Sequence, residues 1–327
     1  MPDLEHLYDI EQEKPNRRNY IFKEGQNNYH DFYVPPVDYK PVVKIKYPRV
    51  LCGIEIEVED VGAPNEFLVS LKQKDVWMVK RDGSLRNNGY EYIFQKPLHG
   101  DHLSYSIENF FNKLPEHAIF SRRTSIHVHL DVRHWTYEHL YKLAMTYMPF
   151  EKLLYVLAGG HRYNNIFCVP LSETYYPSEL SEKEILVDND PLWDKYSGLN
   201  LGRVHDLGTI EFRQLEGNRD TVRILNWINV LMHIHQYAER TSTKELREIL
   251  VDLNSTSMYQ VFLNKVFGED EMLFLQYDLQ KLMEHGVTNA KMVRHKHEFS
   301  LKLKKELSLN SDLGRAFALD REMLRRT

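Results

Sequence analysis

A chain of 327 residues with a formal net charge of −5 at pH 7 gives no electrostatic case for binding nucleic acid or an anionic membrane. No apolar run approaches the roughly 20 residues that cross a bilayer, and the N-terminus lacks the basic start and apolar body of a signal peptide. The two cysteines, Cys52 and Cys168, offer at most one disulfide and no metal-binding pair. We therefore expect a cytoplasmic protein without a membrane segment.

Residues 1–48 form a polar and aromatic arm in which six prolines interrupt any helix. An arm of this kind usually lies across its own domain or across a neighbouring subunit. Contacts within a homo-oligomer are therefore compatible with this sequence, and we find no chemistry in the arm itself.

The segment 53–59, Gly-Ile-Glu-Ile-Glu-Val-Glu, has the alternation of a β-strand. Its aliphatic side chains can enter a core, while Glu55, Glu57 and Glu59 stand together on the other face. Three like charges on one face need either open water or a bound cation. A solvated amphipathic strand and a cation site are both open interpretations at this point.

A second pair of strands is predicted at 76–80 and 90–94, joined through Asp82-Gly83 and Asn87-Asn88-Gly89, which are strong turn signals. This hairpin places Glu91 among aromatic neighbours. The carboxylate either occupies the wet face of the hairpin or belongs to a site. A helix over 102–114 follows.

Strand 126–132 alternates in the same way, with His127, His129 and Asp131 on its polar face. Neutral imidazole and carboxylate groups are common metal ligands, although a strand histidine can equally be a hydrogen-bonded core residue.

After this strand, the helical period of the apolar residues predicts a helix over 136–157 with Thr136 as N-cap, broken or kinked at Pro149. Residues 172–194 read as an acidic loop, of the length found in lids and substrate loops.

Strands at 195–201 and 209–217 place Glu211 and Arg213 on one face, either as a simple ion pair or as part of a site. The remaining chain is helical by period and is interpreted as scaffold. The predicted helices cover 221–238, 243–253, 257–267, 270–285 and 289–307.

These strands, joined in one antiparallel sheet, would gather acids and one or two histidines on a common side. Such a cluster needs a cation, and its oxygen-rich donor set favours magnesium or manganese over zinc. Cations held in this way commonly bind the phosphates of a nucleotide. Arg213 beside them would stabilise charge on a transferring phosphoryl group.

The ordered motifs resemble the putative amidoligase family, which is grouped with glutamine synthetase and glutamate-cysteine ligase. The resemblance covers about residues 50–235, and no single motif would be specific alone. The motifs are Gly-Ile-Glu-Ile-Glu at 53–57, Asp-Gly-Ser-Leu at 82–85 with Glu91, His-Val-His-Leu at 127–130, Arg162 with Asn165, Cys168 and Pro170-Leu171, and Lys-Tyr-Ser-Gly-Leu-Asn-Leu at 195–201 leading to Gly-Thr-Ile-Glu-Phe-Arg-Gln at 208–214.

This resemblance implies an α+β fold with an antiparallel, saddle-shaped sheet, ATP and Mg²⁺ (or Mn²⁺) as cofactors, and formation of an amide or peptide bond from a small-molecule or peptide carboxylate and an amine. By position, the metal ligands would be Glu55, Glu57, Glu91, Glu211 and one of His127 and His129. Arg213, Arg162 and Asn200 would contact the nucleotide, and Asp82 would serve a metal or deprotonate the amine. One departure is the stretch after Glu91, where a small hydroxyl residue and a proline nearer the acid are expected.

The implied reaction proceeds through an acyl phosphate, which an amine then converts to the amide. Three other interpretations stay open: a guanidino or amine kinase of the same superfamily, a non-haem iron oxygenase on two histidines and one acid, and a non-catalytic nucleotide-binding relative. The excess of acids argues against the oxygenase.

We divide the chain into the arm (1–48), an amidoligase-like catalytic domain (49–240) and a helical extension packed on it (241–327).

Overall fold

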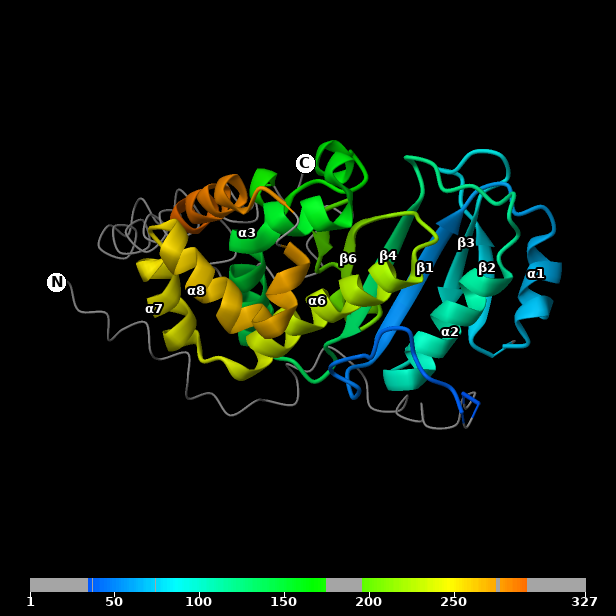
Figure 1. Cartoon of the computed structure of the whole chain (residues 1–327), viewed down its shortest axis with the longest axis horizontal. Coiled ribbons are helices and arrows are strands. Elements are labelled where there is room, and N and C mark those ends of the chain that lie inside the picture. Colours follow the sequence, from blue (N-terminus) through cyan, green and yellow to red (C-terminus); the bar gives the residue numbers. More distant parts are fainter. Residues whose placement is uncertain (1–34, 37, 74, 175–195, 275–276, 293–327) are drawn as a thin grey trace, which may run out of the picture.

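The computed structural model describes residues 35–36, 38–73, 75–174, 196–274 and 277–292. Within them, a six-stranded antiparallel sheet is combined with helices (Figure 1). The predicted α+β class and the antiparallel sheet are therefore confirmed. The strand order is β2-β3-β1-β4-β6-β5, so the sheet is open, with β2 and β5 at its edges. The strands are β1 (Cys52–Val58), β2 (Trp77–Arg81), β3 (Tyr90–Phe94), β4 (Ser125–Asp131), β5 (Leu199–Asn200) and β6 (Thr209–Glu216).

One face of the sheet is apolar and carries the core. The aliphatic side chains that alternate along β1 and β4 are fully buried, as expected for strands with one packed face. Helices α2 (Gly100–Lys113) and α6 (Thr221–Arg240) cross this face (Figure 1). On α2, the Phe110 ring packs against Trp77 and Tyr92, with centroids 4.8 and 5.2 Å away. These aromatic contacts fix the hairpin β2–β3, and hence Glu91, against the rest of the sheet.

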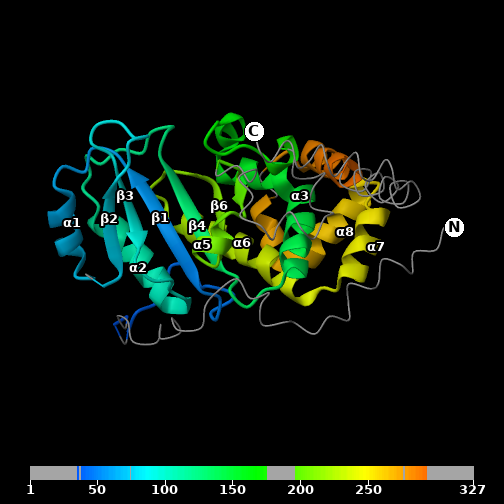
Figure 2. The same cartoon turned by 180° about the vertical axis from the view of Figure 1, so that it is seen from behind.

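Helices also gather at the β6 side of the molecule. Helix α3 (Tyr137–Gly159) lies along α6, and α7 (Thr243–Asp252), α8 (Thr256–Phe267) and residues 279–292 pack beside them (Figures 1 and 2). Phe150 of α3 contacts the rings of Tyr259, Phe262 and Phe267 at 4.8–5.3 Å between centroids. The described part of the helical extension therefore packs on the sheet-bearing part of the chain, and the exact division into domains stays a prediction.

Several local predictions were wrong. Residues 64–71, for which the sequence predicts no helix, form helix α1 (Pro64–Leu71), with Pro64 in the first turn, where its missing N–H costs nothing. Helix α3 is not broken at Pro149, and a kink there stays a prediction. The strand expected over 195–201 shrinks to two residues, and a short helix α5 (Arg203–Asp206) follows it.

The start of the helix predicted over 270–285 was also wrong: residues 268–274 form a 3₁₀ helix, and the α-helix begins only at 279. The predicted arm up to residue 34, most of the predicted loop at 172–194 and the part of the predicted helix beyond residue 292 lie outside the described residues. Among the residues described, no helix has both the length and the apolar character needed to cross a membrane.

Candidate functional site

The strand register places the predicted site residues next to one another on the polar face of the sheet. Glu57 of β1 faces Glu91 of β3, and Glu55 of β1 faces His127 of β4. His129, two residues further along β4, is opposite Glu211 of β6. Four strands therefore contribute to one continuous row of acids and histidines, as the alternating pattern predicts.

Gly53 makes room at one end of this row. It is opposite His129 in the β1–β4 register, and a side-chain carbon added at Gly53 would lie 3.3 Å from the His129 Cβ. A residue with a side chain here would press against the Cβ atom of His129. The glycine therefore leaves room for the His129 side chain.

Three overlapping groups of side chains could each hold a cation, among the residues that the structure describes. In each group, the candidate ligand atoms lie within 4.8 Å of one another. Glu55 and Glu91 each belong to two groups, so neighbouring cations would share ligands. The donor set is mostly carboxylate oxygen, which suits Mg²⁺ or Mn²⁺. The groups are Glu55–Glu91–His127, Glu55–His129–Glu211 and Glu57–Asp82–Glu91.

His129 supplies an independent sign that a cation fits. Its Nδ1 atom is 3.1 Å from the Thr209 hydroxyl, whereas its Nε2 atom is buried without a well-formed hydrogen bond. Glu55 Oε1 lies 3.2 Å from that Nε2 atom, and Glu211 Oε1 lies 3.9 Å from it. Buried polar atoms are rarely left without a partner. A cation among these three atoms would satisfy Nε2 and both carboxylates.

His127 faces the same acids from the next position on the strand. Its Nδ1 atom is 3.0 Å from Glu55 Oε2 and 3.4 Å from Glu211 Oε1. Both histidines therefore reach candidate cation groups, although the resemblance implies only one. The number of histidine ligands stays a prediction, because the geometry admits either or both.

The crowding of charge changes the ionisation of the row. Burial, together with the nearby carboxylates of Glu55, Glu57 and Asp82, raises the pKa of Glu91 to about 9. Burial also opposes ionisation of Glu55, but the close imidazoles of His127 and His129 outweigh it and hold the pKa of Glu55 well below its usual range. Without a cation, Glu91 therefore tends to keep its proton, whereas Glu55 tends to be ionised.

Arg213 lies at the β6 end of the row. Its Nη1 atom is 2.5 Å from Glu211 Oε1, and its Nε donates to the Phe167 carbonyl at 3.4 Å. Burial opposes ionisation of Glu211, but His129 and Arg213 outweigh it and lower its pKa. The predicted ion pair is therefore present, and it holds the guanidinium beside the candidate ligands.

The other predicted residues surround the row in different ways. Asn200 donates to Glu211 Oε2 at 2.7 Å, and Asp82 accepts from the Ser84 backbone N–H while belonging to one cation group. Arg162 is buried and donates to the carbonyls of Arg213 and Gln214. Arg162 thus supports the strand that carries Arg213, and direct contact of Arg162 or Asn200 with a nucleotide stays a prediction.

Three residues of the site, Ser125, Thr209 and Arg203, are not among those predicted from the sequence. Ser125 shares the polar face of β4 with the two histidines, and the period of two could have identified it. Thr209 is bonded to His129, and Arg203 Nε lies 3.6 Å from Glu211 Oε2. Arg203 comes from the short helix α5, for which the sequence has no periodic signal.

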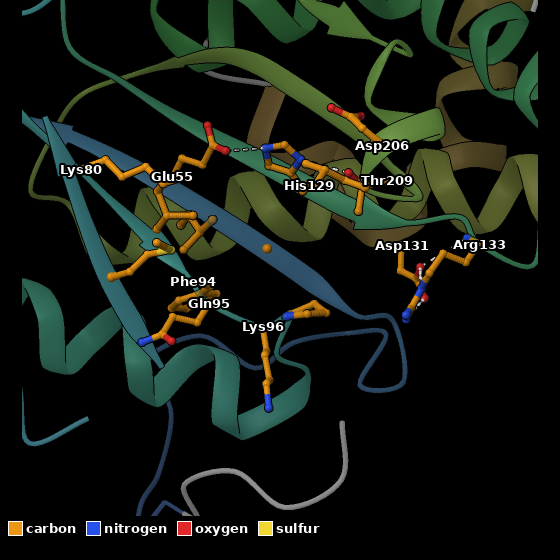
Figure 3. A pocket seen from close by; sticks show the side chains of 16 residues that line it. Glu55, Lys80, Phe94, Gln95, Lys96, His129, Asp131, Arg133, Asp206 and Thr209 are labelled. Carbon is orange, nitrogen blue, oxygen red and sulfur yellow. Dashed lines mark hydrogen bonds and ion pairs between the residues drawn. The ribbon is translucent and has the colours of Figure 1, made fainter. Parts of the chain in front are cut away.

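A pocket of about 460 Å³ opens beside the Glu55–His129 end of the row (Figure 3). Met78, Ile93 and Leu207 supply apolar wall, and Lys80 supplies a cation at the hairpin side. Asp131 and Arg133 form an ion pair on the opposite side, with 2.6 Å between Oδ1 and Nε. The pocket therefore combines apolar surface with charged groups, next to candidate cation ligands.

A family model described as "Putative amidoligase enzyme" matches residues 73–235. A comparison with curated proteins found no match. The match confirms the resemblance to the putative amidoligase family, and the family's name implies a ligase. The matched segment contains Asp82, Glu91, His127, His129 and Glu211. Glu55 and Glu57 precede it, and the β1 register places them in the same row.

Proposed function

We propose that this protein is an ATP- and Mg²⁺-dependent carboxylate-amine ligase that forms an amide or peptide bond through an acyl phosphate. The observation that carries the proposal is the row of three overlapping cation groups, with the buried Nε2 atom of His129 aimed into it, 3.2 Å from Glu55 Oε1. A set of shared carboxylate ligands suits adjacent divalent cations on the phosphates of a nucleotide. The family match over 73–235 supports the ligase class.

In the proposed reaction, an oxygen of the substrate carboxylate attacks the γ-phosphorus of ATP, and the bond from that phosphorus to the bridging oxygen of ADP breaks. The amine nitrogen then attacks the acyl carbon, loses a proton, and displaces inorganic phosphate. No covalent bond to the protein is required. The products are one amide, ADP and phosphate.

The side chains of the row would hold Mg²⁺ through Glu55, Glu57, Glu91 and Glu211 and through the histidines. Bound Mg²⁺ would offset the negative charge of the phosphates. The Arg213 guanidinium, fixed by Glu211 and by the Phe167 carbonyl, would stabilise charge on the transferred phosphoryl group. Arg162 supports this part of β6 by donating to the backbone carbonyls of Arg213 and Gln214.

Asp82 is the candidate for taking the proton from the amine, because it lies at the hairpin end of the row among the acids. The pocket beside Glu55 offers about 460 Å³, enough for the body of a small acceptor. Its apolar walls and its two lysines, Lys80 and Lys96, suggest an acceptor that is itself partly apolar and anionic.

The test is release of phosphate from ATP and Mg²⁺ in the presence of mixed amino acids and diamines. A ligase releases phosphate only when both a carboxylate and an amine are present, and Glu55→Gln and Glu211→Gln abolish the release. A stable phosphorylated product that needs no second substrate would instead establish the kinase alternative. Absence of any nucleotide binding would contradict both.

A further inference from the structure

Ser125 occupies the first position of β4, between two members of the row. It is 3 % exposed and bonds to two site residues at once. Its backbone N–H and its hydroxyl both contact Glu57 Oε2, at 2.7 and 2.6 Å. The same hydroxyl oxygen is 2.9 Å from His127 Nε2. Ser125 thus joins a carboxylate of the Glu57–Asp82–Glu91 group to an imidazole of the neighbouring Glu55–Glu91–His127 group.

We propose that Ser125 is a positioning residue that orients Glu57 and His127 for binding of divalent cations, with His127 coordinating through Nδ1. The inference rests on the proposed cation site and extends it to a residue and to a ligand atom that the sequence motifs leave open.

Counting protons supports this assignment. The serine hydroxyl has one hydrogen, and the 2.6 Å contact to Glu57 Oε2, which also accepts the backbone N–H, directs that hydrogen to the carboxylate. The Ser125 oxygen can then only accept from His127. The imidazole proton therefore lies on Nε2, and Nε2–H donates to Ser125.

With its Nε2 committed to Ser125, the neutral form of His127, which is the form that binds cations, would present the Nδ1 lone pair to Glu55 Oε2 and Glu211 Oε1, 3.0 and 3.4 Å away. In that form, three acceptor atoms face one another, and they repel unless a positive charge lies between them. A bound divalent cation would supply that charge. Outer hydrogen bonds of this kind commonly set the tautomer and ring orientation of metal-binding histidines.

Glu57 is held in a complementary way. Both bonds from Ser125 go to Oε2, so Oε1 is left for the cation group on the hairpin side. Because one serine orients ligands in two groups that share Glu91, its loss should weaken binding in both. Loss of an outer-sphere partner usually costs about 10- to 100-fold in metal affinity.

The experiment is a titration of the full-length protein with Mn²⁺, followed by electron paramagnetic resonance of the free ion. We expect Ser125→Ala to weaken Mn²⁺ binding about 10-fold or more, and Ser125→Thr, which keeps the hydroxyl, to bind within about threefold of wild type. Ser106→Ala is the matched control, since Ser106 is also buried and hydrogen-bonded, but lies on α2 away from the row. It should bind like wild type.

A second readout tests the tautomer itself. In the wild-type protein saturated with Mg²⁺, ¹⁵N resonances of His127 should show the proton on Nε2. Protonation of Nδ1 in that state, or wild-type Mn²⁺ affinity in Ser125→Ala, would overturn the role of Ser125. If the wild type binds no Mn²⁺ at all, the cation site and the proposed function fail together, which is a distinguishable result. The tautomer of His127 in the wild-type protein decides the question even if Ser125→Ala does not fold.

Discussion

Glu57 of β1 and Glu91 of β3 face each other directly across an antiparallel strand pair. Two carboxylates at this position repel, since opposed like charges destabilise a sheet. The protein tolerates the pair because Glu57 is bonded to Ser125, while burial and the surrounding acids raise the pKa of Glu91 to about 9. A proton on Glu91 and a bound cation are therefore alternative ways to neutralise this part of the row.

Replacing Glu91 with glutamine tests this relationship in the cation-free protein. A carboxyl whose pKa is raised on folding keeps its proton in the folded state and loses it in the unfolded state, so its contribution to stability falls as pH rises from about 4.5 to about 9. Glu91→Gln should remove this decline, amounting to about 2 kcal/mol after allowance for screening. Urea unfolding at pH 5, 7 and 9 in EDTA measures it. An unchanged pH dependence in Glu91→Gln would contradict the assignment.

Divalent cations should stabilise the folded protein. At a cation concentration about 100-fold above the dissociation constant, binding to the folded state alone adds about 2.7 kcal/mol, which a rise in the thermal midpoint reports. Glu55→Gln and Glu211→Gln should lose most of this rise, because each removes a shared or buried ligand. Glu116→Gln is the matched control, as Glu116 is exposed and away from the row. Equal stabilisation of all four proteins would place the cation elsewhere.

His235 predicts acid sensitivity unrelated to the row. Its burial lowers its pKa to about 4, and its Nε2 atom is 3.1 Å from the Asp131 carbonyl at the end of β4. A histidine whose folded pKa lies below its unfolded value contributes stability above about pH 6.5, and this stability is lost as pH falls from 6.5 to 4. We expect a loss of up to about 3 kcal/mol over that window. His235→Gln should show a shallower loss in urea unfolding, and an identical slope would refute the prediction.

Arg213 should affect the rate of phosphoryl transfer more than the binding of substrates. Arginines that stabilise a transferred phosphoryl group contribute roughly 10³-fold or more, so Arg213→Gln should reduce phosphate release by about that factor. Arg49→Gln, which changes an exposed arginine of the same charge, should leave release within about twofold. Steady-state kinetics with the active pair of substrates measure both. A defect confined to KM would assign Arg213 to binding alone.

The polar face of the sheet could be predicted from sequence because each of its main strands carries the two-residue period. Glu55, His127 and Glu211 each alternate with buried aliphatic or aromatic neighbours, and the register joins them as expected. The register itself could not be read from the chain. The register places Glu57 opposite Glu91 and Gly53 opposite His129.

Other features depended on contacts that local sequence does not encode. Helix α1 buries Phe67 and Leu71. This single pair, four residues apart, is too short a pattern to predict a helix from the sequence alone. Helix α3 runs through Pro149 without a break, which the local sequence alone leaves open. Ser125 could have been found from its period, but its bonds to Glu57 and His127 arise only when β1 and β4 pair.

The most direct test of the central claim is equilibrium binding of ATP to the wild-type protein with Mg²⁺ and with EDTA, beside Glu211→Gln and Glu116→Gln. The proposed site predicts saturable binding that requires Mg²⁺, is lost in Glu211→Gln and persists in Glu116→Gln. Binding that survives EDTA or the loss of Glu211, or no binding at all, would contradict a cation-dependent nucleotide site on this face of the sheet.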